Sequence, residues 1–407
     1  MGNVVALRCR SCHVEFPPTV RFVCDQCFGG LDVVYKYDDI RLTKSSFDRR
    51  EKSLWRYFEL LPLRDPDRIV NLKPGFSPLR RCDALAKELG LKHLYVKDDT
   101  INPTCSFKDR PSGVAVSKAL EFGFKAVGCA STGNLAAALA AHAAKAGVDC
   151  YVFIPSDVEV NKIVQTAIFG ANIVRVNGTY DDVNRLVTQA ADEYGIGIVN
   201  VTLRPYYVEG SKTVAFEIAE QLGWQVPDHI IVPLASGALL CAICKGFEEL
   251  KKVGLIDGAD VKVTGAQPHG CSPIVDAFKQ GREEIEPVEY PDTVAKSLAI
   301  GDPSDGIYTL RNIRKYRGFA EAVSNREIID SVRLLAETEG IFSEPTGGVT
   351  LGALKRLVED GRISPDERIV CLITGSGLKA PEAVAKSLSN PITVEPRLQA
   401  LAPIVRR

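Results

Sequence analysis

Short apolar runs alternate with longer amphipathic stretches along the chain from about residue 75 onward. Apolar runs bounded by polar turns predict strands, and stretches with apolar residues on one face predict helices. The expected strands cover residues 126–129, 150–154, 172–176, 198–201, 229–233, 261–266 and 369–374. The expected helices cover residues 111–122, 135–146, 161–169, 180–194, 212–222, 239–252, 325–339, 349–360 and 381–388. This alternation predicts a doubly wound α/β protein with mostly parallel sheets, in which the turns after the strands line a cleft.

The first 38 residues lie outside this alternation and contain two cysteine pairs, Cys9-x-x-Cys12 and Cys24-x-x-Cys27. A two-residue spacer lets both thiolates of a pair point at one centre, so the four cysteines are candidate ligands of a structural Zn²⁺ in a zinc-ribbon-like extension. The alternative is a flexible tail with free or oxidised thiols. The other eight cysteines are scattered, and the Cys241/Cys244 pair is better explained as small buried residues of a helix than as a redox motif.

Composition and charge narrow the class of protein. Of the 407 residues, 45% are hydrophobic and 25% are charged, with a net charge of −1, which is ordinary for a globular protein. The near-neutral charge gives no support for a nucleic-acid or anionic-membrane partner. The chain has no apolar run long enough to span a bilayer and no signal-peptide pattern at residues 1–9, so we expect a soluble, cytoplasmic protein.

Two polar turns are candidates for chemistry. Lys108 stands in the turn 102–110, between an apolar run and a predicted helix, and the turn Ser131-Thr132-Gly133-Asn134 precedes an alanine-rich helix. The free N–H groups at that helix start could bind a carboxylate. On their own, both features have plainer explanations: most exposed lysines are solvated surface charges, and Ser or Thr before a helix is an ordinary cap.

Together, the motifs Ser106-Phe107-Lys108-Asp109-Arg110 and Ser131–Asn134 resemble those of pyridoxal-phosphate enzymes of the tryptophan-synthase-β type (fold type II), and most closely the threonine synthase family. Further matches are the segments 75–79, 209–213, 296–301 and 344–348. The resemblance implies two doubly wound, mostly parallel-sheet domains after the extension. The expected division is a zinc-ribbon-like segment 1–38, a large cofactor-binding domain 39–128 plus 205–390, a small inserted α/β domain 129–204 and a C-terminal tail 391–407.

The resemblance also assigns roles to residues. Lys108 would form the Schiff base with pyridoxal 5'-phosphate, and Asn134 would bind the phenolic oxygen of the cofactor. The substrate carboxylate would lie on Ser131, Thr132 and Gly133. The threonine of the segment 373–379, Thr374, would meet the pyridine nitrogen. The cofactor phosphate would lie on the turn after the strand 229–233, at Ser236, Gly237, Ala238 and Leu239, although this turn has one glycine where the commoner family pattern has several in a row.

The implied reaction converts O-phospho-L-homoserine and water to L-threonine and phosphate, the last step of threonine biosynthesis, in a homodimer. Candidates for contacts to the substrate phosphate are Lys108, Arg110, Thr202, Arg204 and Lys212. Many relatives have threonine where this chain has Leu135, and arginine where it has Tyr207. Our hypothesis is that Arg204 or Lys212 takes over from that arginine.

Three alternatives remain open at this point. The chain could replace the phosphate of O-phosphoserine, as cysteate synthase does, or it could be a serine or threonine dehydratase. It could also be a zinc-dependent interaction protein with an inactive enzyme body.

Overall fold

The computed structural model describes residues 3–156, 160–178 and 180–405. A six-stranded sheet forms the centre of the large domain, with the strand order β12-β11-β10-β13-β5-β4. Its strands are β4 (Leu79–Arg81), β5 (His93–Asp98), β10 (His229–Pro233), β11 (Lys262–Pro268), β12 (Ala320–Val323) and β13 (Arg368–Ile373). All neighbouring pairs are parallel except β4 with β5, so the carboxyl ends of β5, β13 and β10 meet at one edge of the sheet.

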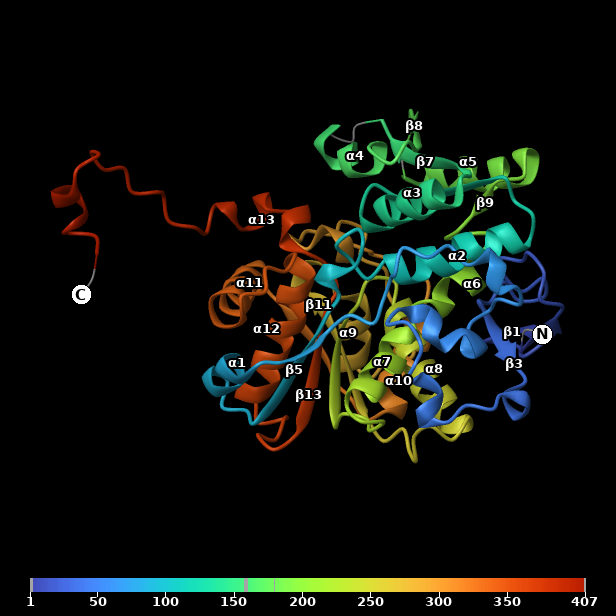
Figure 1. Cartoon of the computed structure of the whole chain (residues 1–407), viewed down its shortest axis with the longest axis horizontal. Helices are drawn as coiled ribbons and strands as arrows, with labels where there is room; N and C mark the ends of the chain where they lie inside the picture. The colour runs from blue at the N-terminus through green and yellow to red at the C-terminus, as the bar shows by residue number, and fades with distance from the viewer. Residues whose placement is uncertain (1–2, 157–159, 179, 406–407) are drawn as a thin grey trace.

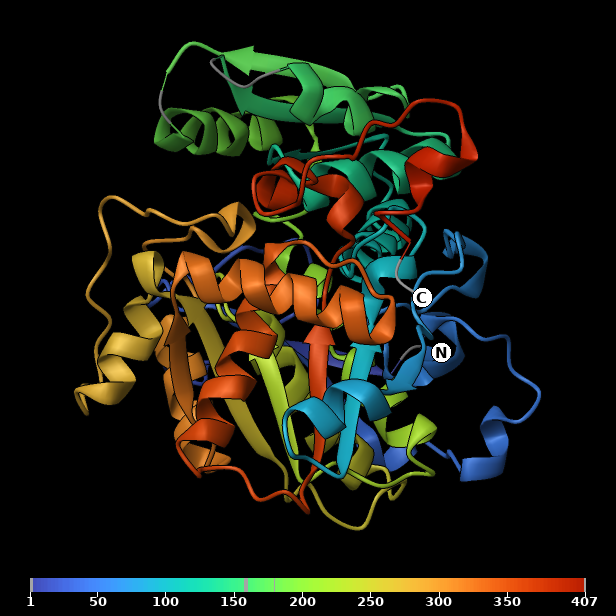
Figure 2. The same ribbon diagram turned by 90° about the vertical axis from the view of Figure 1, so that its left-hand side faces the viewer.

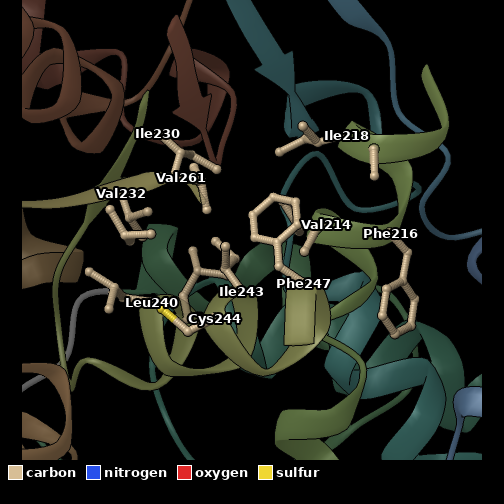
Figure 3. Close-up of a cluster of buried hydrophobic side chains, with 14 of the residues drawn as sticks. Val214, Phe216, Ile218, Ile230, Val232, Leu240, Ile243, Cys244, Phe247 and Val261 are labelled. Carbon is tan, nitrogen blue, oxygen red and sulfur yellow. The ribbon is translucent and has the colours of Figure 1, made fainter. Parts of the chain in front are cut away.

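Helices cover both faces of this sheet (Figures 1 and 2). One face packs on α1 (Asp83–Glu88), α11 (Asn325–Glu339) and α12 (Pro345–Glu359), and the other on α7 (Thr213–Gln221), α8 (Ala238–Lys252), α9 (Pro273–Lys279) and α10 (Gly306–Lys315). Successive side chains of β13 point to opposite faces of the sheet: Val370 lies in the apolar cluster with α7–α10, and Ile369 lies in the cluster with α11 and α12. Figure 3 shows the α7–α8 side, where Ile243 and Leu240 of α8 lie on the side of Val232 of β10, and Phe247 lies beside Val214 of α7. The Cys244 side chain belongs to the same buried cluster, as expected for a small apolar residue.

A second, smaller sheet lies beside the first and is parallel throughout, with the order β8-β7-β6-β9. It consists of β6 (Ala126–Ala130), β7 (Asp149–Pro155), β8 (Asn172–Val176) and β9 (Gly197–Ile198), with α3 (Asn134–Ala146), α4 (Val160–Ala167) and α5 (Tyr180–Tyr194) around it. The helix α2 (Asp109–Glu121) packs on α3 and β6 in one apolar cluster. The expected domain boundary at residue 129 therefore falls inside β6, and β9 is shorter than the expected strand 198–201.

The N-terminal segment forms an antiparallel ribbon of β1 (Val4–Cys9), β2 (Glu15–Phe16) and β3 (Leu31–Tyr35). Its apolar side chains join the cluster of α2 and α3, so the ribbon is packed onto the body. The following 3₁₀ segment η3 (Leu54–Leu60) packs on the body, with Tyr57 buried against the α7–α8 layer.

The remaining described elements connect these layers. They are α6 (Arg204–Glu209), α13 (Glu382–Ala385) and the 3₁₀ turns η1 (Tyr37–Asp39), η2 (Lys44–Phe47), η4 (Pro66–Arg68), η5 (Asp99–Ile101), η6 (His269–Cys271), η7 (Lys296–Leu298), η8 (Gly377–Lys379) and η9 (Leu398–Leu401). The tail after α13 is exposed and runs away from the body, as Figure 1 shows. No helix among the described residues has both the length and the apolar character needed to cross a membrane.

Candidate active site

The Lys108 turn lies at the carboxyl edge of the main sheet, next to the turn that follows β13. The backbone N–H of Phe107 donates to the carbonyl of Thr374 at 2.8 Å, and that of Ser376 donates to the carbonyl of Cys105 at 3.0 Å. Lys108 is the residue before α2, and its Nζ lies 4.7 Å from the ring centre of Phe107 and 5.6 Å from that of Tyr207. Within the described residues this ammonium group has no hydrogen bond and no ion pair, so its nitrogen can react without first losing a partner.

A chain of hydrogen bonds joins the predicted cofactor residues Asn134 and Thr374 through Glu344, which sequence reasoning had noted only as part of a motif. Asn134 Nδ2 donates to both carboxylate oxygens of Glu344, at 3.1 and 3.2 Å. Thr346 Oγ1 donates to Glu344 Oε1 at 3.0 Å, and Thr374 Oγ1 donates to Thr346 Oγ1 at 3.3 Å. The structure thus brings together two groups that are 240 residues apart in sequence and adds a buried carboxylate between them.

The charge of Glu344 depends on this setting. Burial raises the pKa of its carboxyl, while the hydrogen bonds from Asn134 and Thr346 and the positive charges of Lys379 and Lys108 oppose that rise. Gly375 is required beside it, because a Cβ there would lie only 2.3 Å from Glu344 Oε1. In the sequence, Glu344 could have been noticed as the acidic residue directly before Pro-Thr-Gly-Gly, where α12 begins. An acid at the start of a helix is common, however, so its position alone does not mark a functional residue.

The turn after β10 has the geometry of a phosphate cradle. Gly237 adopts φ +91°, and a Cβ on it would lie 2.0 Å from Thr309 Oγ1, so only glycine fits. Within the described part of the chain, the backbone N–H groups of Ser236, Gly237 and Leu239 donate no hydrogen bond, and that of Ala238 reaches only the Ser236 hydroxyl at 3.4 Å. Unpaired amides at the start of the 15-residue helix α8 fit a phosphate group.

The second expected anion site is the turn between β6 and α3. Ser131, Thr132 and Asn134 are half-buried and Gly133 is exposed, with the Gly133 N–H donating to Ser131 Oγ at 3.3 Å. Asn134, the first residue of α3, directs its side chain to Glu344, so this turn lies beside the predicted cofactor residues. These residues together fit pyridoxal phosphate: a free amine, an amide and a hydroxyl for the ring, and unpaired amides for the phosphate.

Arg110 does not lie in this cleft, which corrects its prediction as a substrate contact. Its side chain has no exposed surface and pairs with Asp99 at 2.7 Å and with Glu217. Lys97 Nζ binds the same Glu217 at 2.7 Å. Four buried charges thereby neutralise one another beneath the Lys108 turn.

Lys212 is likewise corrected to a structural ion pair. Its Nζ is buried, with Glu209 Oε2 at 2.6 Å and Glu249 Oε2 at 2.7 Å. Thr202 uses its hydroxyl within its own turn, accepting from Ile198 N at 3.0 Å and donating to Ile198 O at 3.2 Å.

Arg204 keeps some access to solvent, with 24% of its side chain exposed. It donates to Asp305 and, at 3.0 Å, to Ser304 Oγ, so it lies beside the phosphate turn. Two buried hydroxyls near Lys108, those of Ser106 and Tyr207, have no hydrogen-bond partner within the described residues. Such unpaired groups are candidates for ligand contacts.

The four N-terminal cysteines come together as predicted. Their Sγ atoms all lie within 4.8 Å of one another. The N–H groups of Ser11 and Cys12 point at Cys9 Sγ at 3.4 and 3.5 Å, and that of Gln26 points at Cys24 Sγ at 3.4 Å. Burial raises the pKa of Cys9, but the amide hydrogen bonds from Cys12 and Ser11, with the neighbouring thiols of Cys27 and Cys12, outweigh it and lower the value to about 6. A closed set of four thiols with amide support fits a structural metal ion.

Known proteins agree with this geometry. The sequence profile of the family described as "Pyridoxal-phosphate dependent enzyme" matches residues 70–375. The threonine synthase of Methanocaldococcus jannaschii is 42% identical over 98% of this chain and 99% of the relative, and that of Methanosarcina acetivorans is 40% identical over 97% of each.

Solved structures share the fold at lower identity. The processed threonine deaminase isoform 2 of Solanum lycopersicum has a TM-score of 0.65 at 21% identity, over 77% of this chain and 84% of that one. An L-serine ammonia-lyase of Rhizomucor miehei has a TM-score of 0.65 at 22% identity, over 76% of this chain and 96% of that one. The chain therefore belongs to the pyridoxal-phosphate dependent enzymes and, by its identity to relatives over nearly its whole length, to the threonine synthase family.

Proposed function

We propose that the protein converts O-phospho-L-homoserine and water to L-threonine and phosphate. The two relatives named threonine synthase that match over almost the whole chain support this reaction. The observation that carries it is the unpaired Lys108 amine in a turn bonded to the backbone of Thr374, at the edge of the main sheet where β10 and its turn also end.

Lys108 has two tasks in this proposal. Its amine holds pyridoxal phosphate, which when bound supplies an electron sink for charge that develops on the substrate carbons. Once substrate takes its place, the same amine moves protons at the α and β carbons. The rings of Phe107 and Tyr207 beside Nζ limit where the amine can go.

The polar groups of the cleft orient what Lys108 acts on. The turn Ser131–Gly133 binds the substrate carboxylate, and the amides of Ser236–Leu239 bind the cofactor phosphate. Asn134 and Thr374 contact the ring, and Glu344 fixes the position of Asn134 by accepting from its amide. A neutral hydroxyl at Thr374, unlike a carboxylate, leaves the ring less electron-poor, which suits elimination and replacement.

For the substrate phosphate, we propose Tyr207 and Arg204 in place of the arginine of other relatives. Tyr207 is 7% exposed and its hydroxyl is unpartnered within the described residues, although Lys108 lies next to its ring. Arg204 is the partly exposed guanidinium of the same helix α6.

We further propose that Cys9, Cys12, Cys24 and Cys27 hold one Zn²⁺, and that the protein is a cytoplasmic homodimer. Support for the metal comes from the clustered thiols. All twelve cysteines are free thiols, which favours a reducing compartment. Metal analysis of the purified protein, compared with a Cys12→Ser variant, and light scattering test the two statements.

The deciding experiment offers the holoenzyme three compounds: O-phospho-L-homoserine, O-phospho-L-serine and L-threonine. Released phosphate is followed and each product is identified. Threonine formed from phosphohomoserine supports the proposal. Turnover of phosphoserine alone, or deamination of threonine alone, would refute it in favour of a phosphoserine-replacing or dehydratase activity.

A further inference from the structure

Besides its apolar packing, the N-terminal ribbon contacts the body through residues that stand between the two cysteines of its first pair. Arg10 Nη1 donates to Asp305 Oδ1 at 2.6 Å, and the Arg10 guanidinium lies over the Tyr308 ring at 3.8 Å. Ser11 Oγ and the Tyr308 hydroxyl are 2.6 Å apart. The contact is therefore made on the first turn of α10, and only 15% of the Arg10 side chain is exposed.

That turn of α10 also supports the phosphate cradle. The backbone N–H of Asp305 donates to the carbonyl of Ser236 at 2.9 Å. Its carbonyl accepts from Thr309 Oγ1 at 2.9 Å, and Thr309 is the side chain against which Gly237 packs. A shift of Asp305 would consequently move both residues at the centre of the cradle.

Asp305 is fixed by two arginines from different parts of the chain. Its carboxylate is 7% exposed, with Arg10 on one oxygen and Arg204 on the other. Loss of Arg10 would leave Arg204 as the cation at this carboxylate and would expose the first turn of α10. A hydrogen-bonded charge at a mostly buried site is costly to leave half-paired.

The cysteines in turn fix the backbone that carries Arg10. The Arg10 N–H donates to Gly30 O at 2.9 Å, and the next two N–H groups point at Cys9 Sγ. A metal ion on the four thiols would lock this turn, because all the ligand atoms lie within 4.8 Å of one another.

We propose that Arg10 is a positioning residue for the cofactor-phosphate turn, and that the metal-loaded ribbon raises the affinity for pyridoxal phosphate through the contact of Arg10 with Asp305 and Tyr308. The proposal rests on the proposed cofactor and metal sites. It gives the N-terminal extension a role in the reaction.

The test measures the dissociation constant of pyridoxal phosphate by its fluorescence in wild type, Arg10→Ala and the control Arg8→Ala. Arg8 lies on the same ribbon strand, is half-exposed and pairs only with Glu15 among the described residues. We expect the constant to rise about tenfold in Arg10→Ala and to change less than about twofold in Arg8→Ala. The kcat of Arg10→Ala at saturating cofactor should stay within about twofold of wild type, because Arg10 touches no reacting atom.

Metal removal supplies the second arm. Stripping zinc with a chelator should raise the dissociation constant of pyridoxal phosphate about tenfold in wild type. It should raise that constant little further in Arg10→Ala, because this variant has already lost the contact between the ribbon and α10. Tyr308→Ala removes the ring under Arg10 and the hydroxyl contact to Ser11 from the α10 side with the cysteines intact, and should raise the dissociation constant in the same direction, by less than Arg10→Ala, even if Arg10→Ala folds poorly.

Three outcomes overturn the proposal: unchanged cofactor affinity in Tyr308→Ala, unchanged affinity in folded Arg10→Ala with its metal retained, or equal effects of metal removal in wild type and Arg10→Ala. Failure of the proposed function looks different. In that case wild type binds pyridoxal phosphate but makes no threonine, while the affinity shifts of the variants remain.

Discussion

Glu217→Gln is the substitution that tests the correction of Arg110 from substrate contact to structural ion pair. Glu217 is fully buried and accepts from Arg110, from Lys97 at 2.7 Å and from the N–H of Phe76 at 2.6 Å. Burial alone raises the pKa of its carboxyl, but the charges of Arg110 and Lys97 outweigh burial and bring it from 4.5 to about 2. At about 1.4 kcal/mol for each tenfold change in proton affinity, the ionised state stabilises the fold by about 3 kcal/mol at neutral pH.

The sign of the pH dependence follows from the lowered pKa. Stability from such a group is complete above the unfolded-state pKa and is lost as the pH falls towards the folded-state value. The destabilisation caused by Glu217→Gln should therefore be about 3 kcal/mol at pH 7 and shrink by roughly 1 kcal/mol at pH 4. Urea unfolding followed by fluorescence at both pH values measures it.

The control is Glu359→Gln on α12, whose side chain is 61% exposed and lies 3.9 Å from Lys355. We expect less than about 0.5 kcal/mol at either pH. A Glu217→Gln variant as stable as this control, or one whose KM for phosphohomoserine rises without loss of stability, would refute the structural assignment of the Arg110 cluster.

The remaining predictions concern the cleft. Glu344→Gln should lower kcat/KM about 10- to 100-fold, because Asn134 loses a charged acceptor. It should also flatten the acid limb of the pH profile of kcat/KM, because the variant lacks the buried carboxyl with its raised pKa. An unchanged acid limb would assign that limb to another group. Tyr207→Phe should raise KM for phosphohomoserine about tenfold with kcat little changed, and loss of kcat instead would contradict a binding role. Arg204→Ala should also raise that KM, and unchanged steady-state kinetics would remove Arg204 from the substrate site. Gly375→Ala should displace the Glu344 carboxylate, which a Cβ would approach to 2.3 Å, and change the absorption spectrum of the bound cofactor; a wild-type spectrum would contradict this packing.

Elements with strong local signals were predicted residue for residue. The helix 325–339 is one example: Ser324 and Glu327 form a capping box at its start, and Gly340 ends it at φ +68°. The strand 229–233 is another example, and all five of its residues are buried.

Elements were missed or cut short where tertiary contacts override the local pattern. β12 (Ala320–Val323) contains Glu321, whose charge interrupts the apolar run but pairs with Lys279 Nζ at 2.6 Å. The helix α12 begins at Pro345, four residues before the expected start at 349, because Gly347 and Gly348 resemble a turn. A Cβ on Gly348 would lie 2.3 Å from Ile328 O, so glycine there serves the close packing of α12 on α11.

The same distinction applies to the site. Lys108, Asn134, Gly237 and Thr374 stand directly after strands or before helices, where the fold alone brings polar turns to one edge. Glu344 and Asp305 act through side chains far away in sequence, which no local pattern records.

Charge pairing explains why the sequence alone could not distinguish the cations that form buried ion pairs from the unpaired Lys108. Arg110 and Lys212 look as suitable as Lys108 in a linear reading, yet each is held by two buried carboxylates. Those acids stand 3 to 107 positions away in the sequence, so the pairing of each cation is a property of the packed structure. Among the described residues, Lys108 has no such partner, and a covalent bond at its nitrogen breaks no ion pair. The buried pairs around it keep the surrounding charge balanced whatever the state of that one amine, and this difference between paired and unpaired cations supports our proposal that Lys108 is the reactive lysine.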